Sequence, residues 1–411
     1  MHVVLVTHYY HPEVGAPQRR WGALIPRFLE AGHQVTVLAP SPHYPAGHAV
    51  DLERKDKPGK RGTGPWGEHV IRLRFREHGP DLRSRVVDQL VTAVDASVQG
   101  LLDLHGRRRP DVMVVTIPGI PSIFAAGLLK RALRVPLVVE MRDAWPDLVE
   151  ASGMLGTGRG RRGWRARATT QIHSFLTQRQ RRAAAVVTTT ESFADVLRLR
   201  GVERVDVIRN GAALDEVPYL GPRQGEGPLR VAYVGTVGRA QGLHTAVEAA
   251  AELARRGTPI DLRIVGGGAE LERLEHLSFL SGADVDIRGR VPRAEVIDHY
   301  RWADSILVSL RDWEPMHWTV PSKLYESLAT GRHVTGVVEG EAEHLITRNG
   351  AGHVSPPEDP GALADLWQRL ATHRDELAVG DGGRAWAMEH SDYDRLAAHY
   401  LALLEDVRRR R

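Results

Sequence analysis

The chain has 411 residues, a formal net charge of +4 and no cysteine. Its length exceeds what one hydrophobic core usually serves, so we expect two domains. Because cysteine is absent, the sequence excludes disulfides, thiolate catalysis and zinc or iron–sulfur sites with cysteine ligands, and it fits a reducing cytoplasm.

Arginine carries most of the positive charge, in stretches at Arg159–Arg167, Arg179–Arg182 and Arg408–Arg411. Such stretches suit either an ordinary solvated surface or contact with an anionic membrane. Aromatic residues do not alternate with them in the manner of a single-strand binding groove, so nucleic acid is not an expected partner.

The first residues, MHVVLVTHYY, lack the basic segment and the cleavage site of a signal peptide. One uncharged run, Val112–Leu129, approaches the length of a membrane span, but Pro118, Gly119 and Pro121 divide it into a strand, a turn and a helix. We therefore expect a soluble, cytoplasmic protein, and peripheral contact with the inner face of the membrane stays open.

The first half alternates apolar strands with helical patterns. His2–Thr7 is a continuous apolar run, and apolar residues then recur at helical spacing from Trp21 to Leu29. Further strands are predicted at Gln34–Ala39, Val112–Thr116, Leu137–Met141 and Ala185–Thr189. This order predicts a parallel sheet with helices on both faces.

The same order restarts after residues 215–228, a stretch rich in proline and glycine that we interpret as a linker. It predicts a helix at Leu243–Ala254 and strands at Val231–Val234, Leu262–Val265, Asp286–Ile287, Ile306–Leu310 and Val334–Val338. We expect an N-terminal domain at 1–214, a C-terminal domain at 229–385, and a last helix within 386–411 that returns to the first domain. Two such α/β, Rossmann-like domains would face a central cleft that holds the ligands.

The segment WTVPSKLYESLATGRHV predicts a helix with a binding site at its start. Pro321 suits a first helical position, and Gly331 suits the left-handed residue that ends a helix. The first N–H groups of this helix would attract a phosphate, with Ser322 and Lys323 beside them. Glu326 shares their face and is placed to hold a sugar hydroxyl. A surface helix with a Lys–Glu pair is the alternative.

A second loop between a strand and a helix, Gly235–Leu243, offers backbone N–H groups and one arginine, Arg239. With Lys323, Arg239 would form a clamp of two cations on a pyrophosphate and stabilise a departing diphosphate. The sequence has no Gly-x-Gly-x-x-Gly turn, so it favours a mononucleotide diphosphate over a dinucleotide. A plain turn is the alternative for this loop.

Aromatic and imidazole side chains follow the first two strands. They suit sugar stacking and hydrogen bonding, although packing within the loops explains them equally well; they are His8, Tyr9, Tyr10, His11, His43 and Tyr44. Arg142 and Asp143 follow a later strand and could touch a cationic or hydroxyl-rich transition state. Asp284 and Asp286 form an Asp-x-Asp pair that we interpret as a solvated strand edge, and no metal site is predicted.

Seven segments together resemble the GT-B glycosyltransferases of family 4, most closely the branch of colanic-acid and O-antigen amino-sugar transferases. In chain order they are YHPEVGAPQRR, GHQVTVLAPSPHYPAG, EMRDAWPDLVEASGML, VIRNGA, YVGTVGRAQGL, IVGGGAELERL and VPSKLYESLATGRHV. The resemblance covers nearly the whole chain. It implies a retaining transferase that moves a hexosyl or amino-sugar group from a nucleotide-diphosphate sugar. A UDP-sugar is favoured over a GDP-sugar, and neither a cofactor nor a catalytic metal is expected.

The resemblance also implies roles for single residues. Arg239 and Lys323 would hold the diphosphate, and Glu326 would hold the ribose. The residues expected to bind the donor are Gly15, Gly235, Arg239, Arg290, Val291, His317, Ser322, Lys323, Leu324 and Glu326. The residues expected to be catalytic are Arg239, Lys323 and Asp143, while Arg142 joins the aromatic and imidazole residues in binding the acceptor.

Three positions depart from the family pattern. The family often has two glutamates eight residues apart, but Trp318 stands where the first is expected, which leaves Glu314 or His317 to contact the donor sugar. Gln241 replaces a lysine that is frequent in the second loop, and Ala16 replaces the second glycine of a Gly-Gly pair. The identity of the donor sugar depends most on these changes.

The expected reaction needs no protein base, because the leaving phosphate can take the proton of an acceptor that attacks from the same face. The acceptor is either a small molecule or a polyprenyl-linked sugar. Two alternatives are a non-hydrolysing sugar-nucleotide epimerase and a sugar-nucleotide-binding protein without catalysis.

Overall fold

The computed structural model describes residues 1–44, 47–49, 52–79, 81–117, 119, 121–145, 147–152 and 162–410. They divide into two compact units, Met1–Arg209 with Tyr393–Arg411, and Asn210–Asp392. The division falls at Arg209, ahead of the boundary that we expected at residue 214. Residues 215–228 are bound to the second unit, because Leu220 donates its backbone N–H to Thr330 (2.7 Å) and Arg223 forms an ion pair with Asp304 (2.7 Å).

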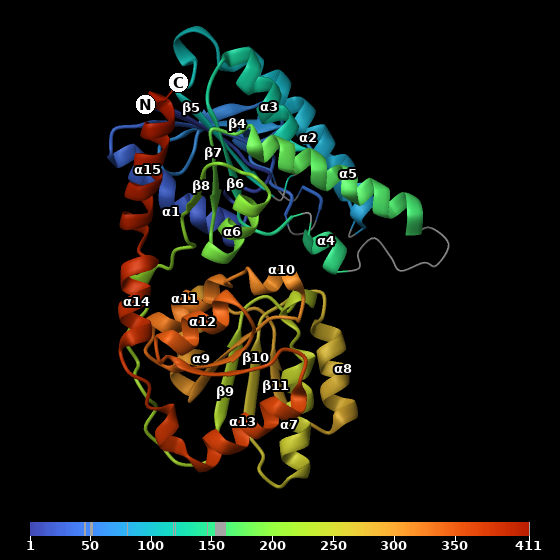
Figure 1. Cartoon of the computed structure of the whole chain (residues 1–411), viewed down its shortest axis with the longest axis vertical. Helices are drawn as coiled ribbons and strands as arrows, with labels where there is room; N and C mark the ends of the chain where they lie inside the picture. The colour runs from blue at the N-terminus through green and yellow to red at the C-terminus, as the bar shows by residue number, and fades with distance from the viewer. Residues whose placement is uncertain are drawn as a thin grey trace. The chain divides into compact units, whose positions relative to one another are not determined.

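The first unit is built on an eight-stranded sheet in the order β3-β4-β2-β1-β5-β6-β7-β8 (Figure 1). Only β3 pairs antiparallel with its neighbour, β4. The strands are β1 (His2–Val6), β2 (Gln34–Pro40), β3 (Arg61–Thr63), β4 (His69–Leu73), β5 (Val112–Ile117), β6 (Leu137–Met141), β7 (Ala185–Thr188) and β8 (Val205–Val207). The helices are α1 (Ala16–Glu30), α2 (Leu82–Asp103), α3 (Ser122–Leu133), α4 (Asp147–Ala151), α5 (Arg162–Arg181), α6 (Glu191–Leu199) and α15 (Tyr393–Arg409). Every residue of β5 is buried, as expected of a central parallel strand.

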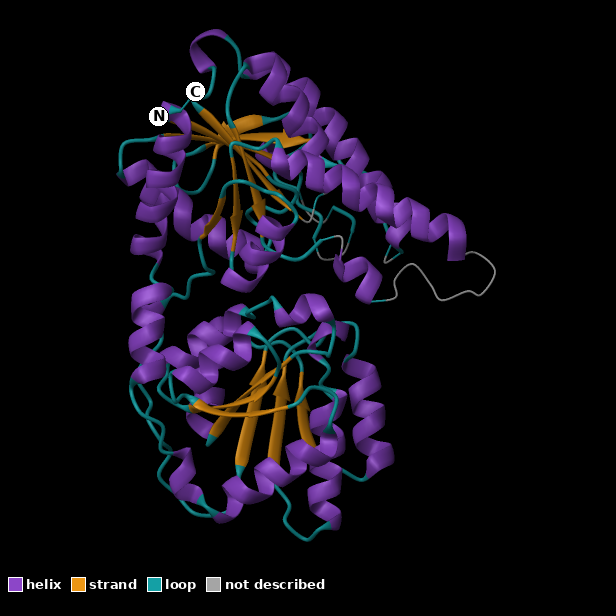
Figure 2. Cartoon of the chain, in the orientation of Figure 1, coloured by secondary structure: helices purple, strands orange, loops and turns teal. Residues whose placement is uncertain are grey.

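The second unit is a six-stranded parallel sheet in the order β11-β10-β9-β12-β13-β14, with helices on both faces (Figure 2). The strands are β9 (Arg230–Val234), β10 (Asp261–Val265), β11 (Val285–Arg288), β12 (Ser305–Ser309), β13 (His333–Val337) and β14 (Gly352–Ser355). The helices are α7 (His244–Arg255), α8 (Leu271–Ser281), α9 (Arg293–Trp302), α10 (Glu314–His317), α11 (Ser322–Ala329), α12 (Glu341–Arg348), α13 (Pro360–Thr372) and α14 (Gly382–His390). The α/β fold with two Rossmann-like sheets, predicted above, is thus confirmed.

Each predicted strand appears with its ends within one residue of the expected ones. The helix α11 begins at Ser322 as expected, but Pro321 is its N-cap and not its first helical residue, with φ −66° and ψ 134°. Gly331 has φ +65°, so it supplies the left-handed conformation predicted at the end of this helix.

A buried ion pair joins distant parts of the first unit. Arg20 of α1 donates from Nε to Glu140 of β6 at 2.9 Å, and both side chains are at most 1% exposed. The same guanidinium donates to the backbone oxygens of Ile208 and Arg209, at 2.9 and 2.5 Å. It therefore fixes the segment after β8 to the sheet and to α1.

No helix within the described ranges is both long enough and apolar enough to cross a membrane.

Removing the cation of this pair should weaken the first unit strongly. We predict that Arg20→Met costs about 3–5 kcal/mol, because the Glu140 carboxylate would stay buried without its partner. The measurement is hydrogen exchange of the β6 peptides together with urea unfolding. Arg27→Met is the matched control, since its pair with Asp394 is exposed (31% and 77%) and should be worth less than about 1 kcal/mol. Equal losses in the two variants would contradict the prediction.

Candidate functional site

Two glycine turns at the carboxyl ends of β9 and β10 lie against each other in the second unit. The N–H of Gly235 donates to Val265, and the N–H of Val237 donates to Gly267. A Cβ on Gly266 would lie 1.7 Å from the Gly235 oxygen, and one on Gly268 would lie 2.1 Å from the Val237 oxygen. Glycine is therefore required at both positions, since any side chain would push the turns apart.

The ammonium of Lys323 lies beside this pair of turns. A Cβ on Gly235 would lie 2.7 Å from Lys323 Nζ, so the missing side chain at residue 235 makes room for the lysine. The Nζ atom lies 3.5 Å from the centre of the Tyr233 ring, a cation–π contact. It is buried and has no hydrogen-bond partner among the described residues.

Burial lowers the pKa of Lys323 from its ordinary value of 10.5 to about 7, against the opposing attraction of Glu326. Lys323 is the second residue of α11, where the backbone N–H groups lack partners within the helix. Ser322 beside it is half-buried, and Leu324 is fully buried. An anion placed here would meet both the free N–H groups and the ammonium.

The carboxylate of Glu326 is held by an arginine that the sequence analysis missed. Arg293 of α9 donates to Glu326 Oε1 at 3.1 Å and to Glu216 at 2.8 Å. Arg293 thus links Glu326 of α11 to Glu216, and three separate segments of the chain meet at this contact. Nothing in the spacing of these segments along the chain indicates that they meet.

The other expected donor residues of this unit surround the same turns. Arg239 is exposed and begins a 3-10 turn three residues after Thr236, in the loop that carries Gly235. The Arg290 side chain lies over the glycine turn, because a Cβ on Gly267 would be 2.9 Å from Arg290 Nε. Val291 packs partly buried beside the ends of β9 and β10.

His317 lies between two carboxylates, whereas Asp286 of the Asp-x-Asp pair lies on an edge strand. His317 Nε2 is 2.9 Å from Asp312 and 3.1 Å from Glu339, so two carboxylates hold its ring. Glu314, the other residue expected to replace the missing glutamate, is exposed. Asp286 pairs with Arg263 at 2.7 Å on the edge strand β11, as we expected of a solvated strand edge.

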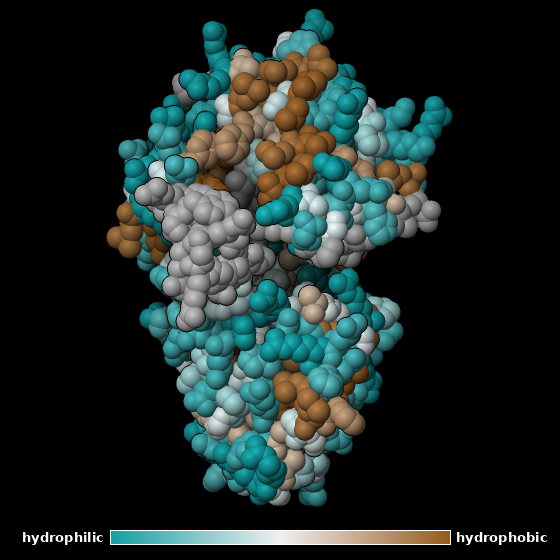
Figure 3. All heavy atoms as spheres, turned by 90° about the vertical axis from the view of Figure 1, so that its right-hand side faces the viewer, coloured by the Kyte–Doolittle hydropathy of each residue, from teal (hydrophilic) through white to brown (hydrophobic). Residues whose placement is uncertain are grey.

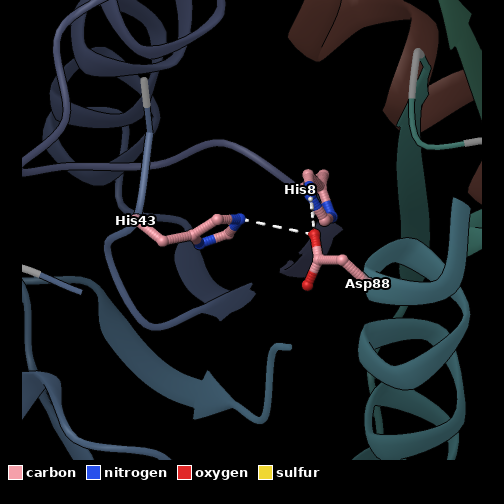
Figure 4. Close-up of side chains that lie close together, drawn as sticks. All are labelled: His8, His43 and Asp88. Carbon is pink, nitrogen blue, oxygen red and sulfur yellow. Dashed lines mark ion pairs between the residues drawn. The ribbon is translucent and has the colours of Figure 1, made fainter. Parts of the chain in front are cut away.

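In the first unit the structure brings His8 and His43 together around a residue that the sequence analysis missed, Asp88 of α2 (Figure 4). The Asp88 carboxylate points between the two imidazoles. His8 Nε2 lies 3.1 Å and His43 Nε2 3.4 Å from Asp88 Oδ2, and all three side chains are at most 3% exposed. Asp88 is one of three aspartates in α2, and nothing in the sequence distinguishes it from Asp95 and Asp103.

The other aromatic residues divide between the surface and the core. Tyr9 packs edge-on against both His8 and Tyr44, with ring centres 4.9 and 5.2 Å apart, and Tyr44 is exposed. Burial raises the pKa of Tyr9 to about 12. Tyr10 is a core residue whose hydroxyl donates to Glu68 at 2.7 Å, which matches the packing alternative.

The remaining residues that we expected in a binding or catalytic site lie near the ends of strands and helices. His11 is half-buried and packs edge-on against Trp66, and burial lowers its pKa. Gly15 is the extended N-cap residue of α1. Arg142 and Asp143 follow β6 directly, and burial lowers the pKa of Arg142 and raises that of Asp143.

Two family models match the chain. Residues 15–211 match the glycosyl transferase 4-like domain, and residues 228–373 match the glycosyl transferases group 1. WbjE of Pseudomonas aeruginosa, assigned as a glycosyltransferase, is 26% identical over 87% of this chain and 84% of that protein. WcaL of Escherichia coli, assigned to colanic acid biosynthesis, is 28% identical over 43% of this chain and 44% of that protein.

Solved glycosyltransferase structures share the fold over the full length. Sucrose-phosphate synthase from Thermosynechococcus elongatus has a TM-score of 0.74 at 17% identity, covering 99% of this chain and 98% of that one. Alr3699/HepE of Anabaena, solved with UDP-glucose, has a TM-score of 0.66 at 12% identity, covering 98% and 99%. The two family models together span most of the chain, which belongs to the GT-B glycosyltransferases of family 4 and is a glycosyltransferase.

The buried Lys323 should make folding stability depend on pH. The unfolded chain binds a proton at this lysine up to pH 10.5, whereas the folded chain releases it near pH 7. Burial of the protonated Lys323 therefore lowers the free energy of unfolding by its full amount below pH 7. This loss of stability disappears as the pH rises towards 10.5. We predict that Lys323→Met raises the stability at pH 7 by up to about 5 kcal/mol, and by much less at pH 10.

The measurement is urea unfolding of both proteins between pH 7 and 10, with the exposed Lys57→Met as control. Parallel stability curves for Lys323→Met and wild type would contradict the prediction.

Proposed function

We propose that this glycosyltransferase takes its sugar from a nucleoside-diphosphate donor bound at the second unit and transfers it with retention of configuration. The observation that carries the proposal is the Lys323 ammonium, buried without a hydrogen-bond partner in the described residues, at the start of α11. A buried cation without an anion is costly, so a site of this kind is maintained for an anionic ligand.

The groups around Lys323 are of the kind that bind a diphosphate. The helix N-terminus offers N–H donors to one phosphate, and the two glycine turns let the backbone come close to the ligand. Arg239, exposed in the adjacent loop, supplies a second cation for the other phosphate. Glu326, held by Arg293, is oriented to accept hydrogen bonds from ribose hydroxyls.

The chemistry follows from stabilising the leaving group. The bond between the anomeric carbon and the diphosphate oxygen breaks, and negative charge grows on the diphosphate, where Lys323 and the helix N-terminus stabilise it. The acceptor oxygen forms the new bond on the same face, and its proton passes to the departing phosphate. A fixed ammonium supplies the charge that a metal ion would otherwise provide, so we propose catalysis without a cofactor or metal.

A UDP-sugar is the donor we favour, and a GDP-sugar is the second choice. The HepE structure, which shares the fold, contains UDP-glucose, and this supports uridine as the base. For the sugar itself, His317 is the group we assign to its hydroxyls, because two carboxylates orient its ring. Asp143 and Arg142 at the end of β6 are assigned to the acceptor side of the reaction, with Tyr9 and Tyr44.

Replacing the buried ammonium should weaken donor binding. We predict that Lys323→Met lowers the affinity for the preferred nucleotide sugar about 10- to 150-fold, the value of a charge-assisted hydrogen bond of 1.5–3 kcal/mol. Calorimetry with UDP-glucose, UDP-N-acetylglucosamine and GDP-mannose measures it. At pH 8 binding to wild type should also take up a proton, because the diphosphate raises the pKa of Lys323 back towards its ordinary value.

Lys130→Met is the matched control, since Lys130 lies on α3 of the first unit and donates to Arg182. Undiminished affinity and proton uptake in Lys323→Met would remove the basis of the proposal.

The first unit, to which we assign the acceptor, carries an apolar surface that the sequence analysis did not find. Apolar side chains stand exposed along one stripe of α2 and continue on α3; they are Val86, Leu90, Val94, Val98, Leu102, Phe124 and Leu128. Figure 3 shows apolar atoms gathered on this part of the first unit. Exposed arginines at Arg83, Arg85 and Arg131 flank the stripe. We propose that it rests on an anionic membrane that carries a lipid-linked acceptor.

A charge within the stripe should release the protein from vesicles. We predict that the double variant Val94→Glu/Leu102→Glu lowers flotation with vesicles of phosphatidylcholine and phosphatidylglycerol by at least tenfold. Leu199→Glu, at a residue that is 89% exposed on α6, is the control and should float as wild type does. Equal flotation of all three proteins would mean that another surface contacts the membrane, and no flotation of wild type would favour a small soluble acceptor.

A further inference from the structure

Three buried side chains of the first unit converge on one point. His8 follows β1, His43 follows β2, and Asp88 comes from the second turn of α2. One ligand atom of each lies within 4.8 Å of the other two. Parallel strands end on the same edge of the sheet, which brings the two histidines together, and α2 places its carboxylate between them (Figure 4).

The protonation of His43 follows from its second nitrogen. His43 Nδ1 lies 2.8 Å from the backbone oxygen of Ser41, which can only accept, so Nδ1 carries the hydrogen. In the neutral ring, Nε2 then presents a lone pair to Asp88 Oδ2. Both atoms are buried, and the other group near this oxygen is His8 Nε2, 3.1 Å away. Two acceptors facing each other repel unless a positive charge lies between them.

The contacts that hold the His43 ring and the Asp88 carboxylate in place are of the kind found around metal ligands in proteins. A carbonyl that accepts from the distal nitrogen of a histidine fixes the ring and its tautomer, as in many metal sites. The other oxygen of Asp88 accepts the backbone N–H of Arg76 at 2.9 Å. The His43 ring is also stacked on Phe75, with ring centres 4.6 Å apart. Ring and carboxylate are thus fixed before any ion arrives.

The spacing suits a tetrahedral ion. Zinc bonds to histidine nitrogen and carboxylate oxygen are about 2.0–2.2 Å long, so two ligand atoms of a tetrahedral site lie about 3.3–3.5 Å apart. Asp88 Oδ2 lies 3.1 Å from His8 Nε2 and 3.4 Å from His43 Nε2, and the ligand atoms of the two histidines lie within 4.8 Å of each other. Two imidazoles and one carboxylate form a set that zinc and similar divalent ions prefer, with a fourth position for water or an acceptor oxygen.

We propose that His8, His43 and Asp88 bind one divalent cation of the zinc class in the first unit. This site is separate from the donor site and does not depend on the proposed function. The ion would fasten the loops after β1 and β2 to α2. The His78 ring, which lines a surface pocket with His48, Glu77 and Gly79, packs edge-on against His43 with ring centres 5.7 Å apart.

The test is a titration of the full chain, freed of metal by chelator, with Zn²⁺ and Co²⁺. We expect one Co²⁺ per chain with the strong visible absorption of a tetrahedral site, competition by Zn²⁺, and a higher melting temperature with Zn²⁺. His43→Gln and Asp88→Asn should each weaken the affinity at least 100-fold. The matched control is His317→Gln, because Asp312, His317 and Glu339 form a second, more exposed cluster of possible ligands.

Two outcomes would overturn the proposal. One is no uptake of either ion by wild type, which would make the cluster an imidazolium–carboxylate network. The other is uptake that His317→Gln abolishes and His43→Gln leaves intact. If the variants of the first unit fail to fold, nitrogen NMR of the imidazoles in wild type decides the question, because Zn²⁺ must shift Nε2 of both His8 and His43.

Discussion

The proposed donor site depends on one electrostatic constraint, an ammonium to which the described part of the chain offers no hydrogen-bond acceptor. Lys323 is held over the Tyr233 ring and against Gly235, and burial lowers its pKa to about 7. A structural lysine would instead reach water or a carboxylate, since the side chain is long enough to do so. The second unit therefore gives up stability to keep a cation ready for its ligand, a cost that is typical of functional sites.

The backbone around Lys323 is shaped by the same constraint. Gly235, Gly266 and Gly268 allow two turns to touch through their main chains, and the missing side chain at residue 235 leaves room for the Lys323 ammonium. Because all six strands of this sheet are parallel, the turns and the helix start belong to the same edge. Arg293 then orients Glu326 from the side. The anion site is thus a product of sheet topology and glycine positions before any ligand contributes.

Periodicity and motif order predicted most of the fold and the helix on which the proposed donor site is built, because both depend on local sequence. The apolar run of β5 and the segment from Pro321 to Gly331 are examples in which neighbours along the chain determine the structure. Asp88 and Arg293 could not be predicted in this way, since their roles arise from contacts with elements far away in sequence. The stripe on α2 was missed because an apolar residue at helical spacing normally indicates a buried face.

The two candidate sites are complementary in charge, and this suggests how such sites are recognised in a structure. At Lys323 a buried donor lacks an acceptor, which indicates an anion. At His43 and Asp88 a buried imidazole nitrogen and a carboxylate oxygen lie 3.4 Å apart, and a positive charge between them, a proton or the proposed metal ion, would join them. Arg20 and Glu140, by contrast, form a buried ion pair at 2.9 Å. Since a fold satisfies nearly all of its buried polar atoms, those that it leaves unsatisfied at the carboxyl edge of a parallel sheet are best explained by the ligand that completes them.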